Sequence, residues 1–284
     1  MKKLAVLFLF IVGAFLVYCA LVFLEGRSIK NVRPNLSAKP VNGMIIKSIE
    51  GENAKATLLN YSFWILHSDY SFVPEKLSIL KNIADEYKNL GIDDKHKKLM
   101  ELYARYKKDT TGTSYLVTSI PSYQKKWDTV QLLVKSGKYE EAVTASQKDP
   151  YALANTAHAL YEKTGDYKMA LELVGIAIEE FKTGNYANGH LLGIAGAYSG
   201  LKEYKKATDV VMLSQDTSFW SDTTLPMIKY YSDQQDFDTA LYLVTRTENK
   251  YGQAEALLYI SQSIKNDGTP LNPKYIKMLD IVLK

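Results

Sequence analysis

The sequence predicts an all-α fold built from repeated helix pairs, and three observations support this prediction. Apolar residues in the body of the chain recur at the spacing of amphipathic helices, and alternating strand-like stretches are nearly absent there. Short turn-like segments separate these helices. One spacing also recurs: a large residue, an aromatic residue six positions later, and alanine three positions after that. Its copies are Tyr161–Tyr167–Ala170, Tyr198–Tyr204–Ala207, Tyr231–Phe237–Ala240 and, more weakly, Leu133–Tyr139–Ala142.

The clearest unit lies between residues 151 and 182. Apolar residues fall on one face of a helix over 153–163 and again on one face over 168–181. Between them, Gly165 suits a helix C-terminus and Asp166 suits the start of the next helix. We expect the rings of the recurring aromatic residues to pack over this turn. The recurring alanine is small, which lets the two helix backbones approach closely.

The recurring aromatic positions are 139, 167, 204 and 237, spaced 28, 37 and 33 residues apart. This is near the period of about 34 residues of one class of helical-repeat protein. The chain resembles the tetratricopeptide-repeat family over 123–265. The resemblance implies a tetratricopeptide-like helix-turn-helix superhelix, an α-solenoid. The matching positions are Tyr161, Gly165, Tyr167, Ala170 and Ala177, whereas Ala154 and His158 depart from the family pattern, and Lys202 and Gln235 replace the turn glycine in later units.

The flanks of these repeats are also predicted to be helical. Residues 51–122 hold weakly repeat-like helix pairs, with a faint copy of the repeat pattern around Tyr87 and Gly91. Residues 266–284 are predicted to form a C-terminal capping helix. The segment 60–66, NYSFWIL, is apolar almost throughout, so it is expected to be buried under the first repeat. The alternative is an oligomer contact or docking beside a membrane.

Residues 4–24 carry no charge and are predicted to form a transmembrane signal-anchor between a short tail, 1–3, and a linker, 25–50. These 21 residues would form a helix about 32 Å long, which matches a bilayer core of about 30 Å. The alternative is a cleaved signal peptide, whose apolar core is about 7–15 residues long. Residues 18–20, Tyr-Cys-Ala, do not supply the small residue at both places that cleavage requires.

The orientation of this anchor depends on its flanking charges. Lys2 and Lys3 favour a cytoplasmic N-terminus, whereas the basic residues of 25–50 oppose it. The short tail resembles bacterial signal-anchors. We therefore expect a single-pass protein of the bacterial inner membrane, with its body periplasmic or otherwise extracytoplasmic.

Charge and composition give no sign of nucleic-acid binding or catalysis. Of the net charge of +4, Lys2 and Lys3 supply two positive charges and residues 25–50 three, which leaves the body about one charge negative. A basic surface for nucleic acid is therefore not expected. Cys19 is the only cysteine, and no two of the four histidines have the spacing of a helical metal pair. The chain is predicted to hold no metal or cofactor and not to be an enzyme.

The resemblance implies a protein-binding function, because helical-repeat solenoids bind protein segments along an extended surface. We expect a membrane-anchored scaffold or assembly factor. The alternatives are a structural subunit of a membrane complex and an enzyme that uses the repeats as a platform. In the family, the first helix of each pair lines the binding surface. This places the following residues at the partner site: Asn155, Ala159, Glu162, Leu192, Gly193, Gly196, Leu225, Lys229 and Ser232.

Two of these positions, Gly193 and Gly196, lie inside an expected helix. Glycine there costs about 1 kcal/mol of stability relative to alanine. Something therefore has to approach this backbone closely. That neighbour is either an apolar segment of a partner protein or another helix of the same chain.

Overall fold

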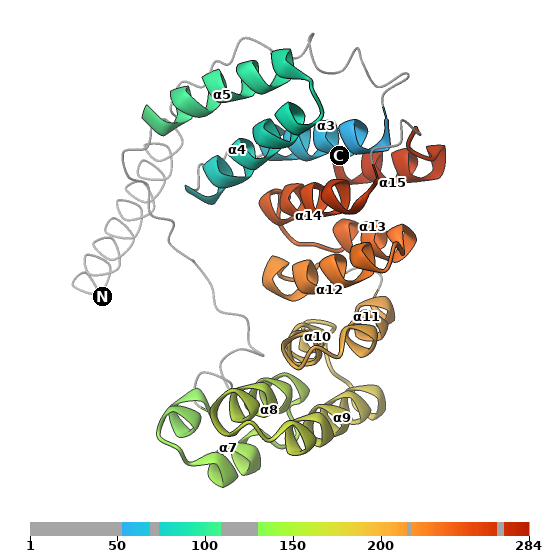
Figure 1. Cartoon of the computed structure of the whole chain (residues 1–284). Coiled ribbons are helices and arrows are strands. Elements are labelled where there is room, and N and C mark those ends of the chain that lie inside the picture. Colours follow the sequence, from blue (N-terminus) through green and yellow to red (C-terminus); the bar gives the residue numbers. More distant parts are fainter. Residues whose placement is uncertain (1–52, 69–73, 109–129, 215–216, 266–269, 284) are drawn as a thin grey trace, which may run out of the picture. The chain divides into compact units, whose positions relative to one another are not determined.

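The computed structural model describes residues 53–68, 74–108, 130–214, 217–265 and 270–283, and this part of the chain is all-α (Figure 1). The chain divides into two units, Met1–Ile45 and Ile46–Lys284, and every described residue belongs to the second. The predicted anchor, 4–24, and linker, 25–50, lie outside the described residues. Among the described helices, none has both the length and the apolar character needed to cross a bilayer.

The helices form in the order expected of successive helix pairs, with one additional helix, α3, at the start. Residues 130–135 form a further helical segment before α7. The named helices are α3 (Ala54–Ser68), α4 (Pro74–Asn89), α5 (Asp93–Lys108), α7 (Tyr139–Ser146), α8 (Pro150–Thr164), α9 (Tyr167–Thr183), α10 (His190–Gly200), α11 (Tyr204–Leu213), α12 (Ser221–Asp233), α13 (Phe237–Thr245), α14 (Lys250–Ser263) and α15 (Pro273–Leu283).

The turn inside each pair explains the recurring sequence spacing. In the five units named below, the residue four positions after the first residue of the recurring pattern has a left-handed backbone, whether it is glycine or not. Glycine adopts this conformation without strain, whereas a residue with a Cβ does not. The left-handed residues are Gly91 (φ 71°), Gly137 (φ 74°), Gly165 (φ 74°), Lys202 (φ 62°) and Gln235 (φ 60°).

Four of these five turns share one pattern of hydrogen bonds. In the α10–α11 turn, Lys202 N donates to Ser199 O (2.9 Å) and Glu203 N to Tyr198 O (2.9 Å). These two hydrogen bonds are the pair that defines a Schellman motif. They provide donors for carbonyl groups that would otherwise be unpaired at the C-terminus of the helix. The turns around Gly91, Gly137 and Gln235 repeat it. At Gly165 a single bond to Tyr161 O (2.8 Å) ends the helix instead.

The packing around the recurring residues confirms part of the explanation given for them. The rings of Tyr161 and Tyr167 meet edge to face, with centroids 6.1 Å apart. In the next unit Tyr204 contacts Tyr230 of α12 instead (5.1 Å). The four recurring alanines, at 142, 170, 207 and 240, are all fully buried. The buried alanine is thus common to these four copies, whereas the contact between the two rings of one copy is found at Tyr161–Tyr167.

The first helices of the pairs pack on one another in chain order. Helix α8 contacts α10, α10 contacts α12, and α12 contacts α14 (Figure 1). The second helices pack beside them: α9 on α8, α11 on α10 and α13 on α12. The expected helical-repeat arrangement therefore forms across residues 150–263.

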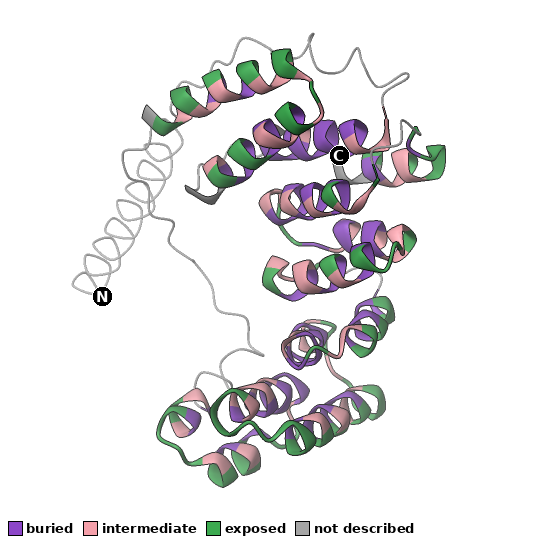
Figure 2. Ribbon diagram, viewed as in Figure 1, coloured by how far each residue is buried: buried purple, intermediate pink, exposed green. Residues whose placement is uncertain are grey.

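The N-terminal helices do not lie where the sequence predicted. Helix α3 holds the apolar segment 60–66 and is buried along most of its length (Figure 2). Its neighbours, however, are α14 and α15 of the last pair, together with α4. The segment is therefore buried, as expected, but it lies against the last helix pair as well as against α4. Within the segment predicted to cap the row, 266–284, α15 (Pro273–Leu283) forms and contacts both α13 and α3.

Buried and partly buried polar contacts join α3 to its neighbours. Tyr61 Oη donates to Asp280 Oδ1 of α15 (2.8 Å), and Ser62 Oγ donates to Ala254 O of α14 (2.6 Å). On the other side, Tyr87 Oη of α4 donates to Asn60 Oδ1 (2.5 Å). An apolar helix with these bonds has its partners on several sides, which explains why it lacks an amphipathic pattern.

Candidate partner-binding site

A pocket lies between α4 and α14, and we refer to it as the α4–α14 pocket. Its volume is about 290 Å³. This is at the lower end of the range for small-molecule sites, so it suits one side chain better than a drug-sized ligand or a nucleotide. The lining residues are Ser78, Ile79 and Asn82 of α4 and Tyr251, Glu255, Leu258, Tyr259 and Gln262 of α14.

The face of α14 that lines this pocket carries Tyr251, Glu255 and Tyr259. Their i, i+4, i+8 spacing places them along one side of a helix. Asn249 caps the helix by accepting a hydrogen bond from Gly252 N (2.6 Å). The other faces of α14 are buried, which leaves this stripe as the half-exposed one. The helix is therefore held on its buried sides while two tyrosines and a carboxylate face the pocket.

Glu255 is the ionisable group at the centre of this stripe. Its side chain is half-buried, and burial raises the pKa of its carboxyl above the usual value. A hydrogen bond with Tyr251 opposes part of that rise. Within the described part of the chain, no lysine, arginine or histidine forms an ion pair with this carboxylate. Its charge is therefore partly removed from water without a compensating cation.

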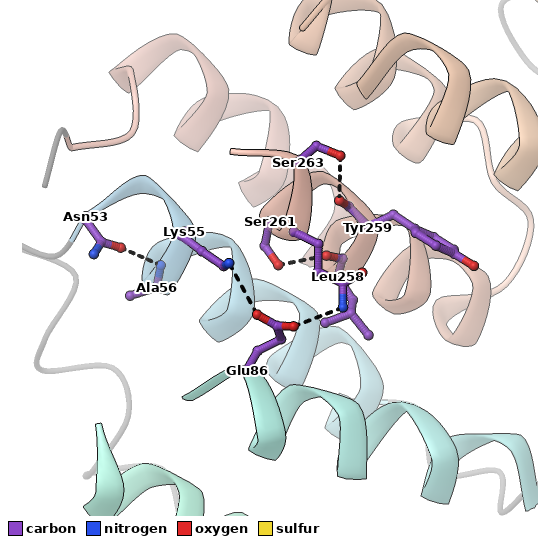
Figure 3. Close-up of polar contacts among 9 residues, drawn as sticks. Asn53, Lys55, Ala56, Glu86, Leu258, Tyr259, Ser261 and Ser263 are labelled. Carbon is purple, nitrogen blue, oxygen red and sulfur yellow. Dashed lines mark hydrogen bonds and ion pairs between the residues drawn. The ribbon is translucent and has the colours of Figure 1, made fainter. Parts of the chain in front are cut away.

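A polar network on the rim of the pocket joins α4 to α14. Gln262 Nε2 donates to Glu86 Oε1 (3.2 Å), and Lys55 Nζ of α3 pairs with Glu86 Oε2 (3.3 Å). Figure 3 shows Glu86 of α4 between Lys55 and the chain of α14. The network neutralises Glu86 within the chain, in contrast to Glu255. The Gln262–Glu86 hydrogen bond links the two helices that form the pocket walls.

Lys229 of α12 reaches the same region. Its side chain is exposed, and Nζ lies 5.7 Å from the centroid of the Tyr259 ring. This separation is within the range of a cation–π contact. Lys229 was predicted as a partner-binding residue, and the structure places it beside the α4–α14 pocket.

The other predicted site residues are not all accessible. Leu192 and Ser232 are buried, and Ser232 Oγ donates to Ile228 O (2.7 Å) of its own helix. Gly193 is buried as well. The prediction that these three face a partner is corrected, because neighbouring helices of the same chain cover them. Asn155 is half-buried, with Nδ2 donating to Tyr151 O (2.8 Å), and Glu162 is exposed.

The two glycines of α10 have different surroundings. A Cβ on Gly193 would lie 2.6 Å from Asn155 Nδ2 and 2.8 Å from Tyr151 Cδ2, both on α8. Glycine is therefore required there by close packing of α10 on α8. A Cβ on Gly196 would meet only Thr223 Oγ1, at 3.4 Å, and Gly196 is half-exposed. Packing within the chain thus explains the glycine at position 193. It does not explain the glycine at position 196.

A second depression, of about 740 Å³, borders α9 and is much more open. Exposed Ile176 and the acidic side chains of Glu172 and Glu179 line it. Glu179 is already paired with Lys182 (2.8 Å). No cluster of three or more potential metal ligands occurs among the described residues.

Neither models of known protein families nor curated proteins match this chain. The candidate site therefore depends on geometry alone. Sequence reasoning missed the α4–α14 pocket because its two walls are about 170 residues apart in the chain. One usable signal was present: Tyr251, Glu255 and Tyr259 share a helix face, and none of them is a typical core residue at that spacing.

Proposed function

We propose that this protein is a scaffold or assembly factor that binds a partner protein through its helical repeats and is held at a membrane by residues 4–24. The observation that carries the proposal is the α4–α14 pocket. Two tyrosines, a carboxylate and the exposed polar side chains of Ser78, Asn82 and Gln262 surround a volume of side-chain size.

The composition of this surface supports protein binding. Tyrosine is enriched at protein interfaces, because its ring adds contact area and its hydroxyl adds a hydrogen bond. Tyr251 and Tyr259 are both half-exposed here, although the chain buries other large aromatic residues such as Tyr87 and Tyr151. Lys229 extends the surface from α14 to α12. A partner segment lying along the first helices of the last two pairs would contact all of these side chains.

Site-specific photo-crosslinking in living cells tests the proposal. A photoreactive residue replaces exposed Asn82 at the pocket in the full chain, and a second variant carries it at exposed Lys168 on α9. We expect one discrete crosslinked protein from position 82 and not from position 168. The same pattern at both positions, or no crosslink at position 82, would contradict binding at this pocket.

The proposed anchor has a separate test. Mass spectrometry of the mature N-terminus, followed by protease treatment of spheroplasts, measures retention and orientation. We expect residues 4–24 to remain attached and the body to be digested from outside. A mature chain that begins within or after this segment would contradict the anchor, and a body protected by a sealed membrane would contradict the orientation.

A further inference from the structure

The Glu255 carboxylate occupies an unfavourable position in the isolated chain. It is half-buried in the α4–α14 pocket, where its side chain accepts a hydrogen bond from the neutral hydroxyl of Tyr251. A charge removed from water costs free energy unless an opposite charge compensates it. Folding alone gives no reason to place a glutamate here, since a neutral side chain of similar length would avoid this cost. Such groups mark sites whose compensating charge arrives with a ligand.

The rings beside Glu255 favour the same kind of ligand. Tyr251 and Tyr259 lie one helical turn before and after the carboxylate and line the same pocket. Lys229 Nζ already lies 5.7 Å from the Tyr259 ring centroid, which shows that a cation is accommodated against this ring. The amide groups of Asn82 and Gln262 on the rim offer oxygen acceptors for N–H donors.

We propose that the α4–α14 pocket receives a lysine or arginine side chain of the partner protein, with the cationic group paired to Glu255 and lying against the tyrosine rings. This inference rests on the proposed protein-binding function and adds the chemistry of the partner. The incoming cation compensates the carboxylate, which forms no ion pair within the described part of the chain.

The other charges near the pocket do not change this preference. Glu86 forms an ion pair with Lys55 at 3.3 Å, and Asp85 forms one with Lys81 at 2.7 Å. The charges within each pair therefore balance. Lys229 is a further basic group near the pocket; its side chain is exposed, and Nζ lies 5.7 Å from the Tyr259 ring centroid. Because its flexible stem ends in solvent, it can move aside when a partner side chain enters.

Pools of seven-residue peptides with random flanks and one defined central residue test the proposal. The central residue is arginine or its neutral isostere citrulline, and lysine or its neutral analogue norleucine. Each pool is passed over the immobilised full chain, and the retained fraction is measured by mass spectrometry. We expect the basic pools to be retained at least about tenfold more than their neutral counterparts. The ratio should fall to about one in Glu255→Gln.

Two further variants make the result specific. Glu172→Gln makes the same change on an exposed position of α9 and should leave the ratio as in the wild type. Tyr259→Leu removes one ring and should also lower the ratio. Thermal unfolding of Glu255→Gln should show a midpoint equal to or above the wild type, because a partly buried charge is removed. A lower midpoint would show that Glu255 has a structural role, and would overturn the inference.

The remaining outcomes separate this inference from the proposed function. A ratio near one in the wild type, a ratio unchanged by Glu255→Gln, or an equal loss in Glu172→Gln would each overturn the basic-side-chain proposal. If neutral pools are retained instead and Tyr259→Leu abolishes their retention, the pocket still binds protein segments and only the inference fails. If no pool is retained and Asn82 yields no crosslink, both fail.

Discussion

At the scale of single residues, Lys202 and Gln235 hold a left-handed backbone that glycine holds elsewhere in the chain. Their φ angles of 62° and 60° place a Cβ close to the following carbonyl. Gln235 offsets this strain, because its Nε2 donates to Ser232 O (3.3 Å) and Ser263 O (3.1 Å). Lys202 is exposed, so the strain at this turn is the simpler one to measure.

Replacing Lys202 with glycine is expected to raise the free energy of unfolding by about 1 kcal/mol, because the left-handed conformation is then unstrained. Urea denaturation of the full chain measures this. Lys202→Ala is the control and should give no such gain, since alanine keeps the Cβ. Gly165→Ala, at φ 74°, should lose a similar amount. A Lys202→Gly protein no more stable than the wild type would contradict the strain.

His67 of α3 links stability to pH. Burial lowers the pKa of His67 below its ordinary value of 6.5, and the positive charge of Lys76 lowers it further. Its Nδ1 lies 3.4 Å from Tyr106 Oη of α5, and its ring stacks on Phe63. The folded chain thus favours the neutral ring, so protonation favours unfolding. The contribution of His67 to the free energy of unfolding is fully present above about pH 6.5. It decreases as the pH falls below that value.

The free energy of unfolding should therefore decrease as the pH is lowered below about 6.5. In His67→Phe, which keeps an aromatic ring but cannot titrate, that part of the decrease should disappear. Denaturant titrations at several pH values measure the free energy of unfolding of the wild type and of His67→Phe. Because both proteins contain the other titratable groups, the contributions of those groups cancel in the difference between the two pH profiles. Parallel pH profiles for the two proteins would show that His67 is not protonated more readily on unfolding.

At the scale of helices, α10 contains two glycines whose substitution should have opposite effects. A Cβ at position 193 would overlap Asn155 and Tyr151 of α8. A Cβ at position 196 would make an ordinary van der Waals contact with Thr223. Gly193→Ala should lower the free energy of unfolding by about 1–3 kcal/mol through overpacking. Gly196→Ala should raise it by about 0.5–1 kcal/mol through helix propensity. In urea denaturation, a Gly193→Ala protein as stable as the wild type would show that α10 does not pack on α8 as described, and a less stable Gly196→Ala protein would contradict the open surroundings of Gly196.

Individual helices and their turns were largely predictable from the sequence, because both depend on neighbouring residues. The period of apolar residues located the helix pairs. The turn lies at Gly165 and also at the corresponding positions of the later units, where Lys202 and Gln235 stand in place of glycine. The exposure of single helix positions was less predictable. Ser232 lies three residues after exposed Lys229, and Gly193 three residues before half-exposed Gly196, so each pair is close on its helix surface. Ser232 and Gly193 are nevertheless buried. Such coverage depends on helix spacing, which one chain segment does not encode.

At the scale of the described part of the molecule, the order of helices in space differs from their order in the chain. Helix α3 packs on α14 and α15, and α4 packs on α14. The sequence did not predict this, because an apolar helix is equally compatible with burial at either end of a repeat row. The α4–α14 pocket, and with it the proposed partner site, exists only because the N-terminal helices dock there.

The docking of α3 at the last helix pair is therefore the central structural claim, and a double-mutant cycle tests it most directly. Tyr61 Oη and Asp280 Oδ1 are 2.8 Å apart, although these residues are separated by 219 positions in the chain. The free energy of unfolding is measured for the wild type, Tyr61→Phe, Asp280→Ala and the double variant. The account predicts a coupling energy of about 1 kcal/mol between the two sites. Strictly additive effects would contradict the docking of α3 against α15 and would remove the basis for the pocket.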